Sequence, residues 1–155
     1  MVSTALVAQQ EGRANPAGAH SFVVRLVTRG GELLRREVVS VIAPGLEGYF
    51  GVKANHAPLI AALGIGAVTV TTPEGQSEHF AVAGGVAEVR DNEMVILADI
   101  GERAEEIDVA RAERAAERAR ARLRGEAAEG RVDHDRAEIA LARALNRLHV
   151  ARRGQ

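Results

Sequence analysis

Arginine and aspartate side chains recur at helical spacing in the last third of the chain. If this segment is an α-helix, Asp108, Arg111 and Arg118 lie within an arc of about 80°. Arg143 and Arg147 stack one turn apart in a second such segment. Guanidinium groups are suited to phosphate oxygens, and several of them repel one another until a polyanion neutralises them. The spacing therefore indicates either a site for a phosphate-bearing ligand or an ordinary solvated face of arginine and glutamate.

The other side chains with catalytic or metal chemistry show no comparable pattern. The five histidines stand apart, without the paired spacing of a metal site. The serines lack the Gly-x-Ser-x-Gly setting of an activated nucleophile, and no glycine-rich phosphate loop is present. The chain has no cysteine, which excludes thiolate nucleophiles and disulfides. We therefore expect no catalytic residue, no metal site, no required cofactor and no enzyme activity.

Composition adds little about partners. The net charge is −1 and 26% of the residues are charged, so neither sign dominates the 155-residue chain and we expect no nucleic-acid partner. No run approaches the roughly 18 apolar residues of a membrane-spanning helix, and residues 1–10 lack the features of a secretory signal. We expect a chain that is soluble or peripheral to another assembly.

Two helices must position the arginines. The first is expected to begin at Asp108, a good N-cap residue, and to end at Gly125; the second is expected to begin at Asp133. Alanines and leucines form one apolar stripe on each helix, which favours close antiparallel packing. Alanine buries little apolar area, so this hairpin is expected to be marginal on its own. Composition alone leaves open whether it is mobile or permanently docked.

Short β-branched runs precede the helices. The expected strands are separated by turn signals such as Gly30-Gly31, Pro73-Glu74-Gly75 and Asp91-Asn92. They cover residues 22–28, 33–42, 67–71, 79–83, 86–90 and 94–100. This spacing predicts a β-sandwich with a core of valine, isoleucine, leucine and alanine. The predicted fold class is β plus α: a flexible extension over residues 1–19, a sandwich over 20–101 and an antiparallel two-helix hairpin over 102–155.

One segment between the expected strands is rich in glycine and aromatic residues. Gly48 to Val52 and then Asn55 to Ile60 put two aromatic rings, two glycines and a proline close together. We interpret it as a tight loop of the kind often used for contact. The same residues are equally consistent with a loop that only connects its neighbouring strands and makes no contact.

Several of these segments together resemble a known family. Residues 47–52 are Glu-Gly-Tyr-Phe-Gly-Val, residues 56–59 are His-Ala-Pro-Leu, and residues 83–89 are Ala-Gly-Gly-Val-Ala-Glu-Val. In this order they closely resemble the epsilon subunit of F-type ATP synthases, and the resemblance covers about residues 22–150. The chain departs from that pattern at Lys53-Ala54-Asn55, where a residue followed by Pro-Gly is usual, and in its first nineteen residues.

The resemblance implies an architecture and a role. Such subunits have a β-sandwich on the central stalk, in contact with the gamma subunit and the ring of c subunits, and a helical hairpin. The hairpin can extend toward the catalytic alpha/beta head and inhibit ATP hydrolysis. It implies a non-catalytic subunit of a proton-translocating enzyme, held at the cytoplasmic face of the bacterial plasma membrane only through the complex. The loop with Tyr49 and His56 is expected to face the ring.

A second motif implies a regulatory ligand. Residues 107–112 match the Ile/Leu-Asp-x-x-Arg-Ala motif with which some bacterial members of this family bind ATP. The ATP-contacting residues implied by the resemblance are Glu102, Ile107, Asp108, Arg111, Ala112, Arg118, Arg143 and Arg147. The arginines are expected toward the phosphates, and the two carboxylates toward the base or ribose. The alternative is a free-standing adaptor whose hairpin binds a nucleotide or another anion.

Overall fold

The fold is known from a computed structural model that describes residues 20–126 and 133–155. The extension expected over residues 1–19, and most of the loop expected over 125–130, lie outside the described residues. Among these described residues, seven strands come first, followed by one short 3-10 helix and two α-helices. The strands are β1 (Phe22–Thr28), β2 (Gly31–Val38), β3 (Ser40–Gly45), β4 (Gly48–Lys53), β5 (Leu59–Thr71), β6 (Ser77–Arg90) and β7 (Glu93–Arg103). The helices are η1 (Ala104–Glu106), α2 (Val109–Leu123) and α3 (His134–Arg153).

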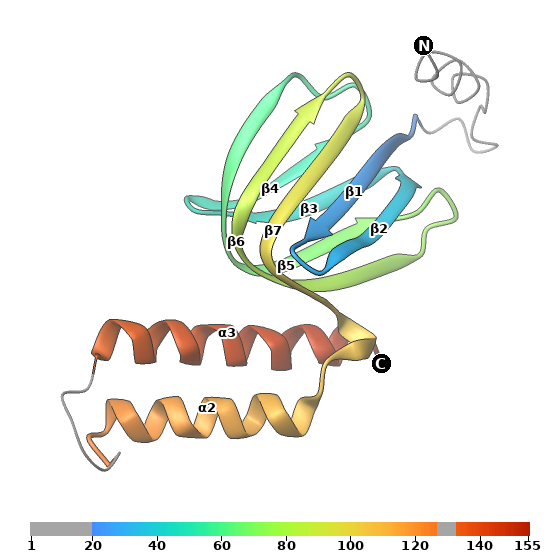
Figure 1. The fold of residues 1–155 in the computed structure, drawn as a ribbon. Helices are drawn as coiled ribbons and strands as arrows, with labels where there is room; N and C mark the ends of the chain where they lie inside the picture. Colours follow the sequence, from blue (N-terminus) through green and yellow to red (C-terminus); the bar gives the residue numbers. More distant parts are fainter. Residues whose placement is uncertain (1–19, 127–132) are drawn as a thin grey trace.

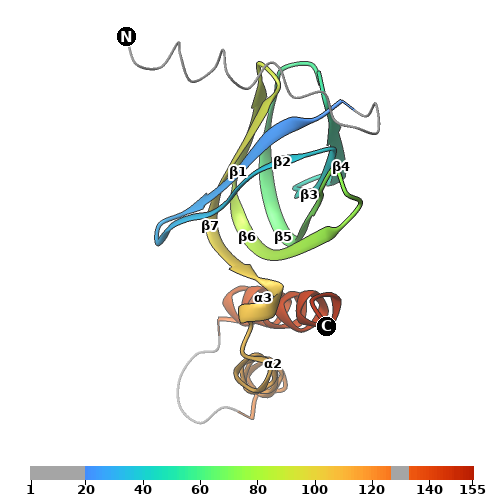
Figure 2. The same ribbon diagram turned by 90° about the vertical axis from the view of Figure 1, so that its right-hand side faces the viewer.

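The strands pair in the order β2-β1-β7-β6-β5-β3-β4. All neighbours are antiparallel except β1 and β7, which run parallel. Strand β2 lies at one edge and β3 lies next to the other edge, yet Val39 alone links them along the chain. One residue spans that gap only because the sheet curls until its two ends approach each other. Figures 1 and 2 show that β5, β6 and β7 are long and bent, and their bending brings the two edges of the sheet toward each other.

The curled sheet encloses one apolar core. Buried side chains from both edges, including Leu34 and Val38 of β2 and Val52 of β4, belong to the same cluster as those of the central strands. The predicted β-sandwich is confirmed, with Phe22 and Phe80 added to its aliphatic core. The bend in β6 needs glycine: Gly85 has φ of +124°, and a Cβ there would lie 2.1 Å from the carbonyl oxygen of Leu97.

Three local predictions about the strands are wrong. The runs predicted as separate strands over residues 79–83 and 86–90 form one continuous strand, β6. The run predicted as one strand over residues 33–42 divides at Val39 into β2 and β3, because its halves pair with different neighbours. The segment predicted as a tight loop forms strand β4 over its first half, since Gly48 to Lys53 pair with Gly45 to Ser40. A loop remains only between Lys53 and Leu59.

The two helices form where their caps and alanine stripes predict them. The Asp108 carboxylate accepts a hydrogen bond from the Arg111 amide, 2.9 Å, and the Asp133 carboxylate accepts one from the Arg136 amide, 3.1 Å. The buried side chains are Ala112, Ala116 and Ala119 of α2 and Ala137, Ala144, Val150 and Ala151 of α3. The antiparallel hairpin is confirmed.

Helix α3 lies between the sandwich and α2 (Figures 1 and 2). It contacts β5, β6 and η1, whereas α2 packs on α3. We call the segment from η1 to the end of α3 the arm. Strand β7 continues to Arg103, so Glu102, placed in the hairpin domain by the sequence, is the penultimate residue of a strand.

Candidate functional site

The arm docks on the sandwich through small apolar side chains. Val150 and Ala151 of α3 lie with Ala104 and Ile107 against Ala67 of β5 and Ala81 of β6. A Cβ added to Gly154, at the end of α3, would lie 2.7 Å from the Cβ of Ala104, so the helix end approaches η1 closely. Ile107, expected at the nucleotide site, is thus part of the docking contact.

An ion pair closes the same interface on one side. The Arg147 guanidinium donates to the Glu102 carboxylate with Nε to Oε2 at 2.8 Å and Nη2 to Oε1 at 3.2 Å. Both side chains are about three-quarters removed from solvent. The fold therefore brings together two of the residues expected at the nucleotide site, one from the end of β7 and one from α3.

Asp108 and Ala112 have structural roles of their own. One Asp108 carboxylate oxygen caps α2. Ala112 is fully buried in the α2–α3 contact, where its small side chain lets the helices approach. These two residues position α2 and hence the arginines that follow.

The remaining arginines of the expected site are exposed. Arg111 and Arg118 of α2 and Arg143 of α3 have no carboxylate within ion-pair distance among residues 20–126 and 133–155. Helical periodicity puts Arg111 and Arg118 on one flank of the α2 alanine stripe. Because the helices are antiparallel with facing stripes, the flank of α3 that carries Arg143 and Arg147 lies on the same side of the hairpin.

This side of the hairpin has the chemistry of an anion site. Four guanidinium groups and two carboxylates give it a net charge of about +2 at neutral pH, with one ion pair formed internally. Three guanidinium groups remain available for phosphate oxygens, which they bind as forks. We call Arg111, Arg118, Arg143 and Arg147 the arginine cluster.

Tyr49 and His56, expected together in a loop, lie at separate places. Tyr49 is on strand β4, and its hydroxyl accepts a hydrogen bond from the Ala67 amide, 3.0 Å. His56 follows the other end of β4, next to Asn55, whose amide donates to Asn92 of the β6–β7 turn. Lys53 lies four positions after Tyr49 on β4, which is about 13 Å of strand. The two residues therefore offer two contact points rather than one.

Sequence reasoning missed Asn146 of α3. Its side-chain amide donates to the carbonyl oxygens of Gly66 at 2.9 Å and Val82 at 3.4 Å. Asparagine is unfavourable in the middle of a helix. An asparagine inside a helix of alanine, leucine and arginine therefore indicates a specific polar contact, and the sequence alone could have revealed it.

His79 of β6 lies near the docked end of the arm. Its Nδ1 is 3.0 Å from the Thr69 hydroxyl. Burial lowers the pKa of this imidazole below its usual 6.5, and the Arg153 charge lowers it further, against an opposing effect of Glu105. Residues of η1 and α3 thus influence a titrating group of the sandwich.

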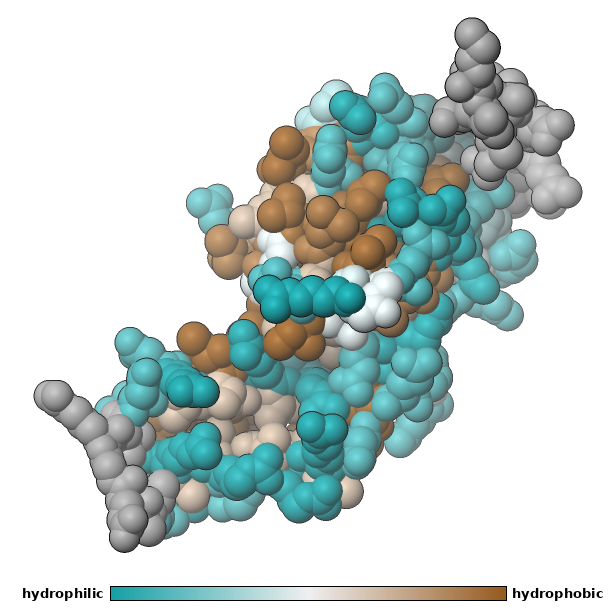
Figure 3. All heavy atoms as spheres, in the orientation of Figure 1, coloured by the Kyte–Doolittle hydropathy of each residue, from teal (hydrophilic) through white to brown (hydrophobic). Residues whose placement is uncertain are grey.

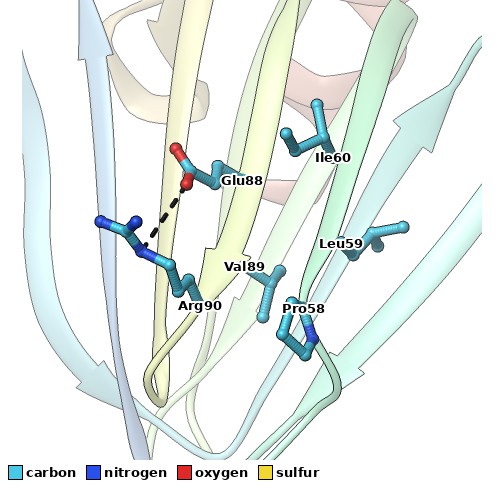
Figure 4. A pocket seen from close by; sticks show the side chains of 6 residues that line it. All are labelled: Pro58, Leu59, Ile60, Glu88, Val89 and Arg90. Atoms are coloured by element: carbon cyan, nitrogen blue, oxygen red, sulfur yellow. Dashed lines mark ion pairs between the residues drawn. The ribbon is translucent and has the colours of Figure 1, made fainter.

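The sandwich also has an exposed apolar surface. Val86 of β6 pairs directly with Leu97 of β7, and Ile60 of β5, 75% exposed, lies opposite Glu88 of β6. Figure 3 shows hydrophobic side chains gathered over the sandwich on the face turned to the viewer. An open pocket of about 400 Å³ lies at this surface, and Figure 4 shows its lining by Pro58, Leu59, Ile60, Glu88, Val89 and Arg90. Its walls are mostly apolar, with one ion pair between Glu88 and Arg90 at 3.8 Å.

The described part of the chain holds no group of three His, Asp or Glu side chains that could bind a metal ion. Within the same ranges, no helix is both long and apolar enough to cross a membrane.

The fold and the site together define a class of two-module proteins, in which a β-sandwich carries a docked helical arm with a basic flank. Family models describe both modules. Residues 21–104 match the β-sandwich domain of the ATP synthase delta/epsilon chain, and residues 105–152 match its long α-helix domain. The chain therefore belongs to the ATP synthase delta/epsilon chain family, as an epsilon subunit of the central stalk of an F-type enzyme.

Individual relatives agree with this assignment. The ATP synthase epsilon chain of Moorella thermoacetica is 47% identical over 131 residues, which cover 84% of this chain and 96% of the relative. That of Syntrophomonas wolfei is 42% identical over 131 residues, covering 84% and 94%. Among solved structures, a chain of the Euglena gracilis mitochondrial ATP synthase OSCP/F1/c-ring complex matches with a TM-score of 0.68 at 27% identity, covering 79% of this chain and 76% of that one.

Proposed function

We propose that this subunit is a non-catalytic regulator that couples the catalytic head to the membrane ring and restrains ATP hydrolysis through its arm. The proposed partners are the gamma subunit and the c ring, and also the alpha/beta head when the arm extends. The proposal rests on family membership and on the similarity to a chain of an F1/c-ring complex. The complex is proposed to move protons and to hold the subunit peripherally at the cytoplasmic face of the bacterial plasma membrane.

Two surfaces support the proposed contacts. The exposed apolar surface around Ile60, Val86 and Leu97 has the character of a protein interface, because such side chains gain free energy when a partner covers them. We assign it to the gamma subunit. Tyr49 and His56 are proposed to contact the ring, at separate points as the structure places them.

The regulatory ligand is proposed to be ATP, bound by the arginine cluster. The observation that carries this proposal is the meeting of arginines from α2 and α3 on one side of the folded hairpin, beside the Glu102 carboxylate. In an extended arm the two helices no longer face each other and the cluster disperses. The arginines would hold the phosphates, while Glu102 and the free oxygen of Asp108 would bind the base or ribose.

Such a ligand regulates by shifting a population. A ligand that binds only the folded arm stabilises that form by its differential affinity for the two forms. If the folded and extended arms differ by a few kcal/mol, a differential affinity of a few kcal/mol is enough to reverse the equilibrium between them. High ATP would keep the arm docked and hydrolysis unrestrained. Low ATP would release it toward the catalytic head. Family membership favours this role over a free-standing anion-binding adaptor.

Calorimetric titration of the purified chain with ATP tests the proposal. Arg143→Ala is the informative variant, since Arg143 is exposed and its loss leaves the Glu102–Arg147 pair intact. We expect it to weaken ATP binding by about 1.5 to 3 kcal/mol, the usual range for a hydrogen bond to a charged group. Arg152→Ala, on the opposite face of α3, is the matched control and should bind as the unmodified chain does.

Two results would contradict the proposal in different ways. If the unmodified chain does not bind ATP, ATP is not the regulatory ligand. Equal losses in Arg143→Ala and Arg152→Ala would show a diffuse charge effect in place of a site. Neither result affects the assignment to the central stalk.

A further inference from the structure

The β3–β5 pairing has a gap at the point where the arm docks. β3 pairs with β5 from Ser40 to Ile42, and pairing resumes at Gly45 opposite Leu63. Residues 64–68 of β5 therefore have no partner in β3. Gly66 and Ala67, which share one peptide group, are both buried within this gap.

Side chains from two distant parts of the chain bind this single peptide group. Its N–H, from Ala67, donates to the Tyr49 hydroxyl at 3.0 Å. Its carbonyl oxygen, from Gly66, accepts from the Asn146 side-chain amide at 2.9 Å. The Gly66–Ala67 peptide is thus bonded to strand β4 on one side and to the arm on the other.

The contact with Tyr49 requires glycine at position 66. A Cβ there would lie 2.5 Å from the Tyr49 oxygen and 2.5 Å from the Cβ of Pro44. The tyrosine is nevertheless 61% exposed, so its ring lies open to a partner while its hydroxyl reaches the strand. A partner that moves the ring moves the hydroxyl with it.

Asn146 selects the position at which α3 docks on the sandwich. Apart from the Glu102–Arg147 pair at its side, the rest of the interface is alanine, valine and isoleucine, whose burial is favourable but non-directional. The asparagine amide can donate to Gly66 and Val82 only when α3 sits in one register on the sandwich. Its loss leaves the apolar contact but removes the bonds that select this position.

The two hydrogen bonds strengthen each other. Donation from a peptide N–H increases the negative charge on its own carbonyl oxygen, and linked hydrogen bonds reinforce one another in this way inside proteins. Withdrawing the Tyr49 hydroxyl therefore weakens the bond to Asn146, and it also leaves the buried Ala67 N–H in the ladder gap without its side-chain partner.

We propose that the Gly66–Ala67 peptide is a latch through which Tyr49 and Asn146 jointly hold the arm docked. Tyr49 and Asn146 are positioning residues, and movement of Tyr49 at a protein contact loosens the arm. The latch deepens the proposed function and rests on two parts of it, that the arm leaves the sandwich and that Tyr49 lies at a contact with a partner. It needs no nucleotide.

Thiol labelling measures undocking directly, because the natural chain has no cysteine. Ala81→Cys places a thiol on β6 beneath the arm, where it reacts only when the arm lifts. Ala87→Cys places one in the sandwich core, where it reacts only on unfolding. Comparing the two rates in the full chain, without ATP, separates undocking from loss of fold.

We expect Asn146→Ala to accelerate labelling at Ala81→Cys roughly 2- to 12-fold, as for the net loss of one ordinary hydrogen bond. Tyr49→Phe, which removes only the hydroxyl, should accelerate it in the same direction. In the Asn146→Ala background Tyr49→Phe should add much less, since the bond that it strengthens is gone. None of these changes should accelerate labelling at Ala87→Cys.

Asn92→Ala is the matched control, because Asn92 also bonds two backbone groups, the Asn55 amide and the Ser21 carbonyl, but at the β6–β7 turn. It should leave labelling at Ala81→Cys unchanged. The latch is overturned if Asn146→Ala does not accelerate labelling there, or if the two substitutions act additively. Failure of ATP binding in calorimetry would remove the proposed regulation and leave these results standing.

Discussion

Two aspartates decide where the arm's helices begin. Asp108 and Asp133 have the same extended backbone and the same side-chain bond to the amide three residues later. Such a cap satisfies a backbone donor that would otherwise be left over in the first turn. Asp108 is both the cap of α2 and a residue expected to contact nucleotide. Substitutions at Asp108 are therefore needed to separate its effect on the helix from its effect on the ligand.

Asp108→Ala should destabilise α2 by about 1 kcal/mol, whereas Asp108→Asn should preserve the cap because asparagine caps as well as aspartate. Hydrogen exchange of the α2 amides measures the difference. Asp133→Ala is the comparison, since it should act on the first turn of α3 instead. Equal exchange in Asp108→Ala and the unmodified chain would show that the cap contributes nothing. ATP binding that falls in Asp108→Asn would identify the charge as the ligand contact.

His79 makes stability depend on pH. Its pKa is lowered in the folded chain, chiefly by burial, so the unfolded chain takes up the proton first as pH falls below about 6.5. Stability is therefore full above that value and declines as the pH drops toward the lowered folded pKa. Urea unfolding at about pH 7.5 and about pH 5.5 should show a smaller pH effect in His79→Gln than in the natural chain. His56→Gln, beside the β6–β7 turn, is the control. An unchanged pH effect in His79→Gln would contradict this explanation.

At the scale of elements, the arm holds to the sandwich with few atoms. Docking uses one valine, one isoleucine and several alanines, together with the Glu102–Arg147 pair and the Asn146 bonds. Each buried methylene contributes about 0.8 kcal/mol, so the small contact fits an arm that detaches in the proposed function. The sandwich core is far larger than this docking contact and contains 18 buried side chains within the described residues. The two modules should therefore open independently.

Val150 is the test of this independence. It is fully buried in the docking contact, and Val150→Ala should weaken docking by about 2 kcal/mol. Hydrogen exchange should accelerate in the arm while the amides of β6 and β7 stay protected, because local opening needs no global unfolding. Val82→Ala, in the sandwich core, should instead accelerate exchange throughout the chain. Uniform acceleration in Val150→Ala would show that the arm and sandwich form one cooperative unit.

Local signals made the arm predictable, and non-local pairing made parts of the sandwich unpredictable. The caps and alanine spacing of α2 and α3 act within a few residues, so the sequence shows them directly. The division at Val39 and the parallel pairing of β1 with β7 depend on how the sheet curls, which no short window contains. For the same reason the sequence could mark Tyr49 and Asn146 only as unusual residues. Their meeting at one peptide follows from the gap between β3 and β5.

At the scale of the whole molecule, the proposed function makes the sandwich the fixed module and the arm the variable one. The arginine cluster is assembled here by α2 and α3 lying together in the docked arm. A ligand of this cluster and a partner that needs the extended arm therefore compete for the same equilibrium. In the proposed function the position of the arm carries the signal, so regulation needs no catalytic residue in this subunit.

The rate of thiol labelling at Ala81→Cys, followed as ATP is added, tests this account most directly. If ATP binds only the docked arm, labelling should slow by a factor of one plus the ratio of free ATP to its dissociation constant, which is about 100-fold when free ATP is at 100 times its dissociation constant. The Arg143→Ala chain should need correspondingly more ATP for the same effect. A labelling rate that does not change as ATP saturates the chain would contradict the claim that nucleotide holds the arm against the sandwich.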